Sequence, residues 1–166
     1  MISRQQLLDK YISGIDLLHE KVSRFSPEEI NFKPSENEWS IKEIIIHLAD
    51  SETNAFIRYR SIISEPGKKA FLVAEAQWAK ALNYQEQPIE NYFHLFRILR
   101  NITYNQLTLL PNDDDIWKNR FTFHDHLGEI NLERWLQIYA DHLDNHLKQM
   151  DRNLERMRIK NQPAVK

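Results

Sequence analysis

Hydrophobic residues recur every three or four positions along four long segments of the chain, which is the periodicity of an amphipathic α-helix. Each segment has one apolar face and one polar face, and four such helices bury their apolar faces best by packing together as a four-helix bundle. The pattern therefore predicts an all-α protein. The four segments cover about residues 4–25, 40–65, 88–110 and 132–157.

Local signals support the start and end of the second helix. Ser40 and Glu43 have the spacing of a capping box, in which the serine hydroxyl and the glutamate side chain satisfy free backbone N–H groups. Pro66 should end this helix. Ser26 followed by Pro27 is also typical of a helix start, so a short helical turn is expected there.

Two connections are longer than most. Residues 68–87 join the second and third helices, and residues 73–82 within them are expected to form a short helix. Residues 112–129 are expected to be mostly loop, so the protein should contain essentially no strand. We interpret residues 1–160 as a single domain and residues 161–166 as a flexible tail.

Composition excludes several classes of protein. The 166 residues include no cysteine, which excludes disulfides, thiolate nucleophiles and iron–sulfur clusters. The three glycines are too few and too far apart for a Gly-rich phosphate loop. A formal net charge of −2 does not favour nucleic acid as a partner, and no apolar run is long enough to cross a membrane. These features predict a cytoplasmic protein that acts on a small molecule.

Histidines supply the candidate chemistry. His142 and His146 are four residues apart on the last helix, so their rings share one face. They interrupt an apolar stripe, as His47 does on the second helix. Three buried imidazoles need partners for their nitrogens, and a divalent transition metal satisfies three at once. Three protein ligands would leave one coordination position open, as in catalytic sites.

The same spacing also occurs in solvent-exposed pairs, so a site without metal stays open as an alternative. The chain has no H-E-x-x-H motif that would supply a general base next to the ligands. His124 and His126 carry much less weight as ligands, and His19 and His94 are expected on the surface. Because a free histidine titrates near pH ~6.5, metal binding is expected to weaken as the pH falls through that region.

Two segments resemble the DinB/YfiT-like superfamily. They are residues 39–52, WSIKEIIIHLADSE, and residues 139–146, YADHLDNH. The resemblance implies a bundle of up-down-down-up topology that often forms homodimers. It also implies that His47, His142 and His146 bind one metal ion. Imidazole ligands suit zinc, nickel, iron or copper, and zinc and nickel are the first candidates. The family includes metal-dependent hydrolases and thiol-dependent transferases such as mycothiol-dependent maleylpyruvate isomerase.

The resemblance leaves the reaction open. The leading hypothesis is a metal-dependent enzyme, either a hydrolase or a transferase that uses a low-molecular-weight thiol as substrate. Asn54, Arg58 and Tyr139 are candidate pocket residues, although a hydrogen bond at the helix edge is an equal alternative for Asn54 and Arg58. The competing hypothesis is a non-catalytic, stress-associated bundle that serves in binding or dimerisation.

Overall fold

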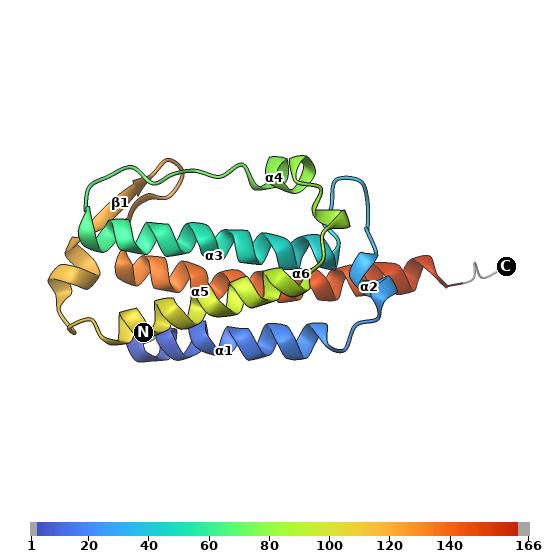
Figure 1. Cartoon of the computed structure of the whole chain (residues 1–166), viewed down its shortest axis with the longest axis horizontal. Coiled ribbons are helices and arrows are strands. Elements are labelled where there is room, and N and C mark those ends of the chain that lie inside the picture. The colour runs from blue at the N-terminus through green and yellow to red at the C-terminus, as the bar shows by residue number, and fades with distance from the viewer. Residues whose placement is uncertain (1–2, 163–166) are drawn as a thin grey trace.

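Four long helices form the body of the protein in the computed structural model, which describes residues 3–162. α1 and α6 run in one direction and α3 and α5 in the other, so the order is up-down-down-up (Figure 1). This confirms the predicted all-α bundle and its topology. The expected tail lies mostly outside the described residues. The four helices are α1 (Arg4–Val22), α3 (Ile41–Ser64), α5 (Glu90–Thr108) and α6 (Leu132–Lys160).

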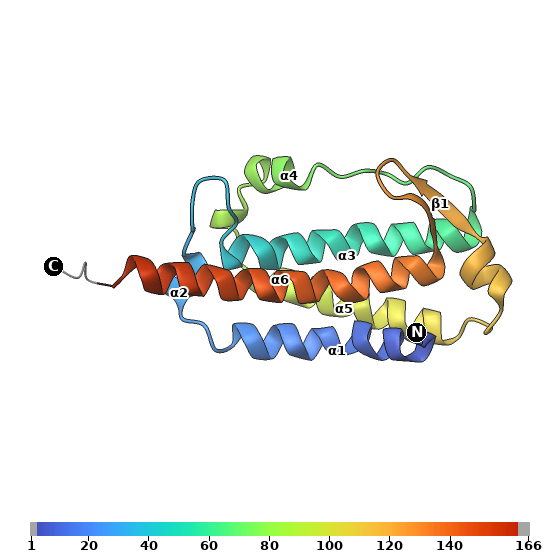
Figure 2. The same ribbon diagram turned by 180° about the vertical axis from the view of Figure 1, so that it is seen from behind.

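The packing order differs from the order along the chain. α3 packs against α5 and α6, and α1 packs against the same two helices. α1 and α3 are therefore diagonal in the bundle, although only the short α2 (Pro27–Asn31) separates them in sequence. The contact of α3 with α6 brings the helix of His47 beside the helix of His142 and His146 (Figure 2).

Three of the helices begin with a capping box. The hydroxyl of Ser40 accepts the backbone N–H of Glu43 at 3.1 Å, and Glu43 accepts the backbone N–H of Ser40 at 2.8 Å. Ser3 and Ser26 make the same paired contacts at the starts of α1 and α2. The predicted starts at Ser26 and Ser40 are thus confirmed.

The long connection between α3 and α5 follows from their direction. Because the two helices are parallel neighbours, the chain must return along the full length of α3, which is about 36 Å for 24 residues. It does so over the outside of the bundle (Figure 1). The returning segment contains α4 (Glu75–Ala81), within the range expected for a short helix, and the 3₁₀ turn η1 (Tyr84–Glu86).

The expectation of essentially no strand is wrong for the connection before α6. β1 (Phe121–His124) and β2 (Gly128–Asn131) form an antiparallel hairpin. The backbone of Phe123 also exchanges hydrogen bonds with Lys68 and Ala70 of the long connection. Two segments that are far apart in sequence thus form backbone hydrogen bonds with each other, and local patterning does not reveal such a contact.

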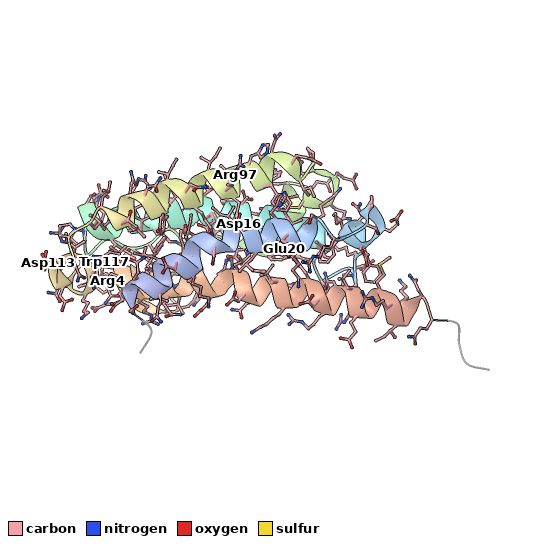
Figure 3. The ribbon with its side chains drawn as sticks, turned by 90° about the horizontal axis from the view of Figure 1, so that it is seen from below. Arg4, Asp16, Glu20, Arg97, Asp113 and Trp117 are labelled. Carbon is pink, nitrogen blue, oxygen red and sulfur yellow. The ribbon has the colours of Figure 1, made fainter. Side chains whose placement is uncertain are left out.

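A one-turn π-helix, η2 (Asp115–Asn119), precedes the hairpin and closes one end of the bundle. Its Trp117 is buried and donates from Nε1 to the carbonyl of Pro111 at 3.0 Å. The guanidinium of Arg4 lies 4.3 Å from the centre of the Trp117 ring (Figure 3). No helix within residues 3–162 is both long and apolar enough to cross a lipid bilayer.

Candidate metal centre

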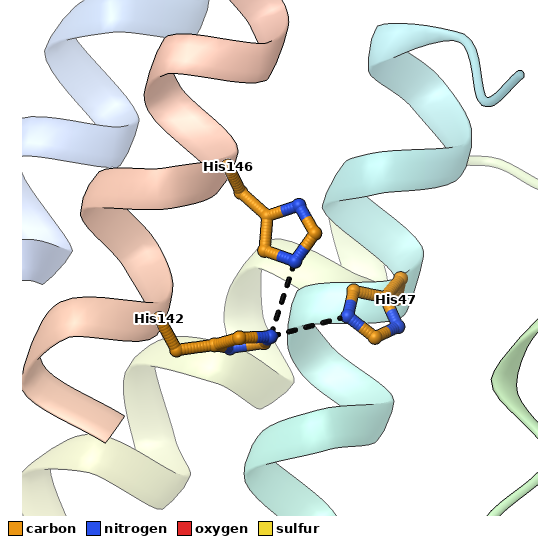
Figure 4. Close-up of side chains that lie close together, drawn as sticks. All are labelled: His47, His142 and His146. Carbon is orange, nitrogen blue, oxygen red and sulfur yellow. Dashed lines mark hydrogen bonds between the residues drawn. The ribbon is translucent and has the colours of Figure 1, made fainter. Parts of the chain in front are cut away.

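Three imidazoles from two helices meet between α3 and α6. Nε2 of His142 lies 3.3 Å from Nε2 of His47 and 3.1 Å from Nε2 of His146 (Figure 4). One nitrogen from each ring falls within 4.8 Å of the other two. The structure therefore brings together all three residues that the sequence singled out, and they are the only such cluster among the described histidines and carboxylates.

The spacing of the Nε2 atoms fits a transition metal. Ligands at the zinc–nitrogen distance of about 2.0–2.1 Å in a tetrahedron are about 3.3 Å apart. The observed 3.1 and 3.3 Å agree with this value. Neutral rings protonated at Nδ1 would direct three lone pairs at one another, and a cation between them removes that repulsion.

A hydrogen bond defines the tautomer of the His146 ring. Nδ1 of His146 lies 2.9 Å from Oε1 of Gln149, one turn further along α6. An amide oxygen can only accept, so the ring donates from Nδ1 and its Nε2 keeps a free lone pair. Such a partner orients an imidazole toward a metal. The i, i+3 spacing of His146 and Gln149 is visible in the sequence, but it was not singled out.

Two further side chains approach His47. The Trp39 ring packs against its imidazole, with ring centroids 4.6 Å apart. Oε2 of Glu75 lies 4.0 Å from Nδ1 of His47, which is too far for a hydrogen bond. Glu75 belongs to α4, and nothing in the periodicity of the long connection places that helix over the centre.

Burial keeps the three rings neutral. Together with a smaller contribution from the charge of a protonated His146, it lowers the pKa of His47 to about 3. Burial also lowers the pKa of His142 well below its usual range, with smaller contributions from its two partners and Arg100. The pKa of His146 is lowered in the same way, although its bond to Gln149 opposes the shift. The loss of metal binding expected near pH 6.5 should therefore move to lower pH.

The three predicted pocket residues do not all lie in one site. Arg58 donates from Nη1 to the hydroxyl of Tyr139 at 2.9 Å and from Nη2 to the carbonyl of Phe71 at 2.8 Å. Asn54 instead donates to the carbonyl of Asp50, one turn earlier on its own helix, at 3.0 Å. Arg58 and Tyr139 thus form a pair next to the centre, whereas Asn54 makes a helix-edge contact.

The other histidines lie outside the centre. His19 and His94 are exposed on α1 and α5, as expected. His124 is part of β1 and His126 is in the turn that follows, with ring centroids 5.9 Å apart. Neither of these two belongs to the three-histidine cluster.

Comparison with known proteins places these observations in a family. A sequence profile of the DinB superfamily matches residues 12–150. A protein of Oceanobacillus iheyensis named "putative metal-dependent hydrolase" is 29% identical over 146 residues, which cover 85% of this chain and 82% of that protein. A protein of Halalkalibacterium halodurans with the same description is 27% identical over 130 residues, covering 73% and 68% of the two chains.

A solved structure shows the same arrangement of helices. YfiT from Bacillus subtilis superposes with a TM-score of 0.82 at 20% identity, over 95% of this chain and 90% of that one. YfiT is described as "a probable metal-dependent hydrolase with an unusual four-helix bundle topology". At this identity the likeness concerns the fold. Because the family profile extends from α1 to α6 and includes all three histidines of the centre, the chain belongs to the DinB superfamily.

Proposed function

We propose that this protein is a metal-dependent hydrolase in which His47, His142 and His146 bind one divalent transition metal, zinc or nickel. The observation that carries the proposal is the convergence of three Nε2 atoms between α3 and α6. Two of the separations are 3.1 and 3.3 Å, and burial keeps the rings neutral. The names of the curated relatives support the same assignment.

A divalent metal supplies Lewis acidity, which polarises a carbonyl and makes water a better nucleophile near neutral pH. The protein holds the imidazoles in place: Gln149 orients His146, and Trp39 packs against His47. Three ligands from the chain leave room for water or substrate.

We assign Glu75 as the carboxylate that accepts a proton from the attacking water. Its side chain is half exposed, so water can reach it, and it lies 4.0 Å from His47. Burial raises the pKa of Glu75, and the positive charge of Arg58 partly opposes this shift. A raised pKa makes a carboxylate a stronger base, which suits it to general base catalysis.

Metal analysis of protein purified without a histidine tag tests the centre. We expect one equivalent of metal, and each of His47→Ala, His142→Ala and His146→Ala should weaken binding by more than the ~10–100-fold caused by losing a hydrogen-bond partner of a ligand. His126→Ala, in the exposed turn, is the matched control and should keep its metal. Wild-type protein without metal, or triad variants that retain it fully, would overturn the assignment.

Ester hydrolysis tests the role of Glu75. With an activated ester such as 4-nitrophenyl acetate, Glu75→Gln should lower kcat by at least ~100-fold, the usual effect of losing a general base. Its metal content should not change. Glu86→Gln alters an exposed carboxylate on the same connection and should retain activity. Equal rates for the metal-free and metal-loaded wild type would contradict the proposed hydrolase.

A further inference from the structure

A small, partly open cavity lies next to the metal centre, between α3, α6 and the β-hairpin. Its volume is about 30 Å³. Its polar lining comes from Arg58, Thr122, His124, Trp135 and Tyr139, and the remaining lining side chains are aliphatic. No carboxylate lines it. A space of this size holds one or two water-sized groups, such as the two oxygens of a carboxylate.

Two of the lining residues each carry a buried N–H group that lacks an acceptor. Nε1 of Trp135 and Nε of Arg58 are both buried, and neither has a hydrogen-bond partner within residues 3–162. Trp135 is only 1% exposed, so solvent does not compensate for the missing bond. Buried donors without acceptors are costly in folded proteins, and such exceptions call for a specific explanation.

The remaining polar groups also favour an acceptor in the cavity. Nδ1 of His124 accepts the backbone N–H groups of His126 and Leu127 at 3.2 and 3.3 Å, so the proton of the neutral ring is on Nε2. The hydroxyl of Tyr139 accepts from Arg58 and keeps its own hydrogen to donate. The hydroxyl of Thr122 donates its hydrogen to the carbonyl of Lys68. Donors therefore dominate the polar lining.

We propose that this cavity binds the carboxylate group of the substrate, with Arg58 as its positive partner and Trp135 as a further N–H donor. The inference builds on the proposed hydrolase and names the class of its substrate: esters or amides of small organic acids that carry a second, free carboxylate. The aliphatic side chains around the polar groups suit the hydrocarbon part of such an acid.

The position of the cavity limits the length of the substrate. Tyr139 and Trp135 precede His142 on α6 by three and seven residues, or about 5 and 10 Å along the helix axis. The rings of Tyr139 and His142 are 6.2 Å apart. The reacting carbonyl should therefore lie about 5–10 Å from the carboxylate, as in extended half-esters of about five- to nine-carbon dicarboxylic acids.

Binding of glutarate, measured by titration calorimetry on metal-free and zinc-loaded protein, tests the proposal. Glutaramide, the neutral diamide of similar shape, is the matched ligand. We expect saturable binding of glutarate and at least tenfold weaker binding of glutaramide. Arg58→Met and Trp135→Phe should each weaken glutarate binding at least tenfold. Arg60→Met removes the same charge from α3, but Arg60 contacts Phe56 and Gln106 outside the cavity, so binding should not change.

Circular dichroism and zinc content show which variants remain folded, and Trp135→Phe or His124→Leu tests the cavity if Arg58→Met does not. Three results would overturn the proposal: no saturable binding of glutarate, equal binding of the diamide, or unchanged binding by the folded cavity variants. The two proposals can fail separately. If the protein binds no metal but still binds glutarate, the hydrolase proposal is wrong and the carboxylate site stands. If the protein binds metal but not glutarate, only the carboxylate site is wrong.

Discussion

The protonation of His47 couples the metal centre to the stability of the metal-free protein. Its pKa is about 3 in the folded chain, whereas an unfolded histidine has a pKa of about 6.5. Between these values the unfolded chain binds a proton that the folded chain does not, so stability falls as the pH falls below 6.5. His142 and His146 shift in the same direction and add to the effect.

This coupling predicts that the free energy of unfolding depends more strongly on pH in the wild type than in His47→Gln. On going from pH 7 to pH 5, the free energy of unfolding of the metal-free wild type should fall by about 2 kcal/mol more than that of the variant, at 1.36 kcal/mol per unit of pKa shift. Urea unfolding at both pH values measures it. His94→Gln, on the surface of α5, should behave like the wild type. The same loss in all three proteins would contradict the assigned burial of His47.

Another single residue, Gly14, makes room for a buried arginine. Arg100 donates to Oε1 of Glu52 and to the carbonyl of Tyr11 at 2.7 Å each, and to the carbonyl of Tyr139 at 2.9 Å. One side chain on α5 thus binds the other three long helices. A Cβ at Gly14 would overlap Nη1 of Arg100 and lie 2.6 Å from Leu143.

Gly14→Ala should therefore destabilise the protein, although alanine is by itself favoured over glycine in a helix by about 1 kcal/mol. We expect a net loss of at least about 2 kcal/mol, because overpacking costs ~1–3 kcal/mol and displacement of Arg100 leaves the buried carboxylate of Glu52 without its positive partner. Chemical denaturation measures the loss. Ser13→Ala, at the exposed neighbouring position, should change stability by less than about 0.5 kcal/mol. A Gly14→Ala protein as stable as the wild type would show that the arginine can move aside.

At the scale of the helices, two capping boxes of the same design differ in burial. Ser40 is fully buried at the start of α3, and its hydroxyl also lies 2.6 Å from Oε1 of Gln85. Ser3 caps α1 at an exposed position. The first turns of α3 lead directly to His47, so the cap at Ser40 also helps to position this proposed metal ligand.

Ser40→Ala should cost about 1–2 kcal/mol, the upper part of the range for a lost N-cap, because the buried partners of the hydroxyl are left unpaired. Ser3→Ala should cost clearly less, since water can replace the hydroxyl there. Urea denaturation of both variants compares them directly. Equal losses would mean that burial does not strengthen the cap at α3.

The helices and their connections show which features could be predicted from the sequence and why the others could not. The apolar periodicity and the Ser40 capping box located α3 to within one residue at each end, because both are local signals. β1 was missed because part of its backbone pairing comes from residues 67–70, more than 50 positions away. His47, His142 and His146 were recognisable because polar residues interrupted apolar stripes. Glu75 gave no such signal, since its approach depends on the path of the long connection.

At the scale of the whole molecule, α5 has a second apolar face. Its inner face packs into the bundle, yet several large apolar side chains point outward at spacings of three, four and seven residues. They are Leu95, Ile98, Ile102 and Leu109, which are 37, 51, 39 and 84% exposed. An exposed apolar stripe on a helix surface is typical of an interaction site. We propose that two copies of this chain pair through α5 as a two-fold dimer, the commonest form of oligomer.

The double variant Ile98→Glu/Ile102→Glu tests this dimer. In a two-fold interface each residue faces the same surface of its partner, so four carboxylates would be buried close together and association should be lost. Sedimentation velocity at micromolar concentration should give twice the monomer mass for wild type and the monomer mass for the variant. Ile159→Glu, equally apolar and 61% exposed near the end of α6, should leave the dimer intact. A monomeric wild type would contradict the dimer, and a dimeric double variant would place its interface away from α5.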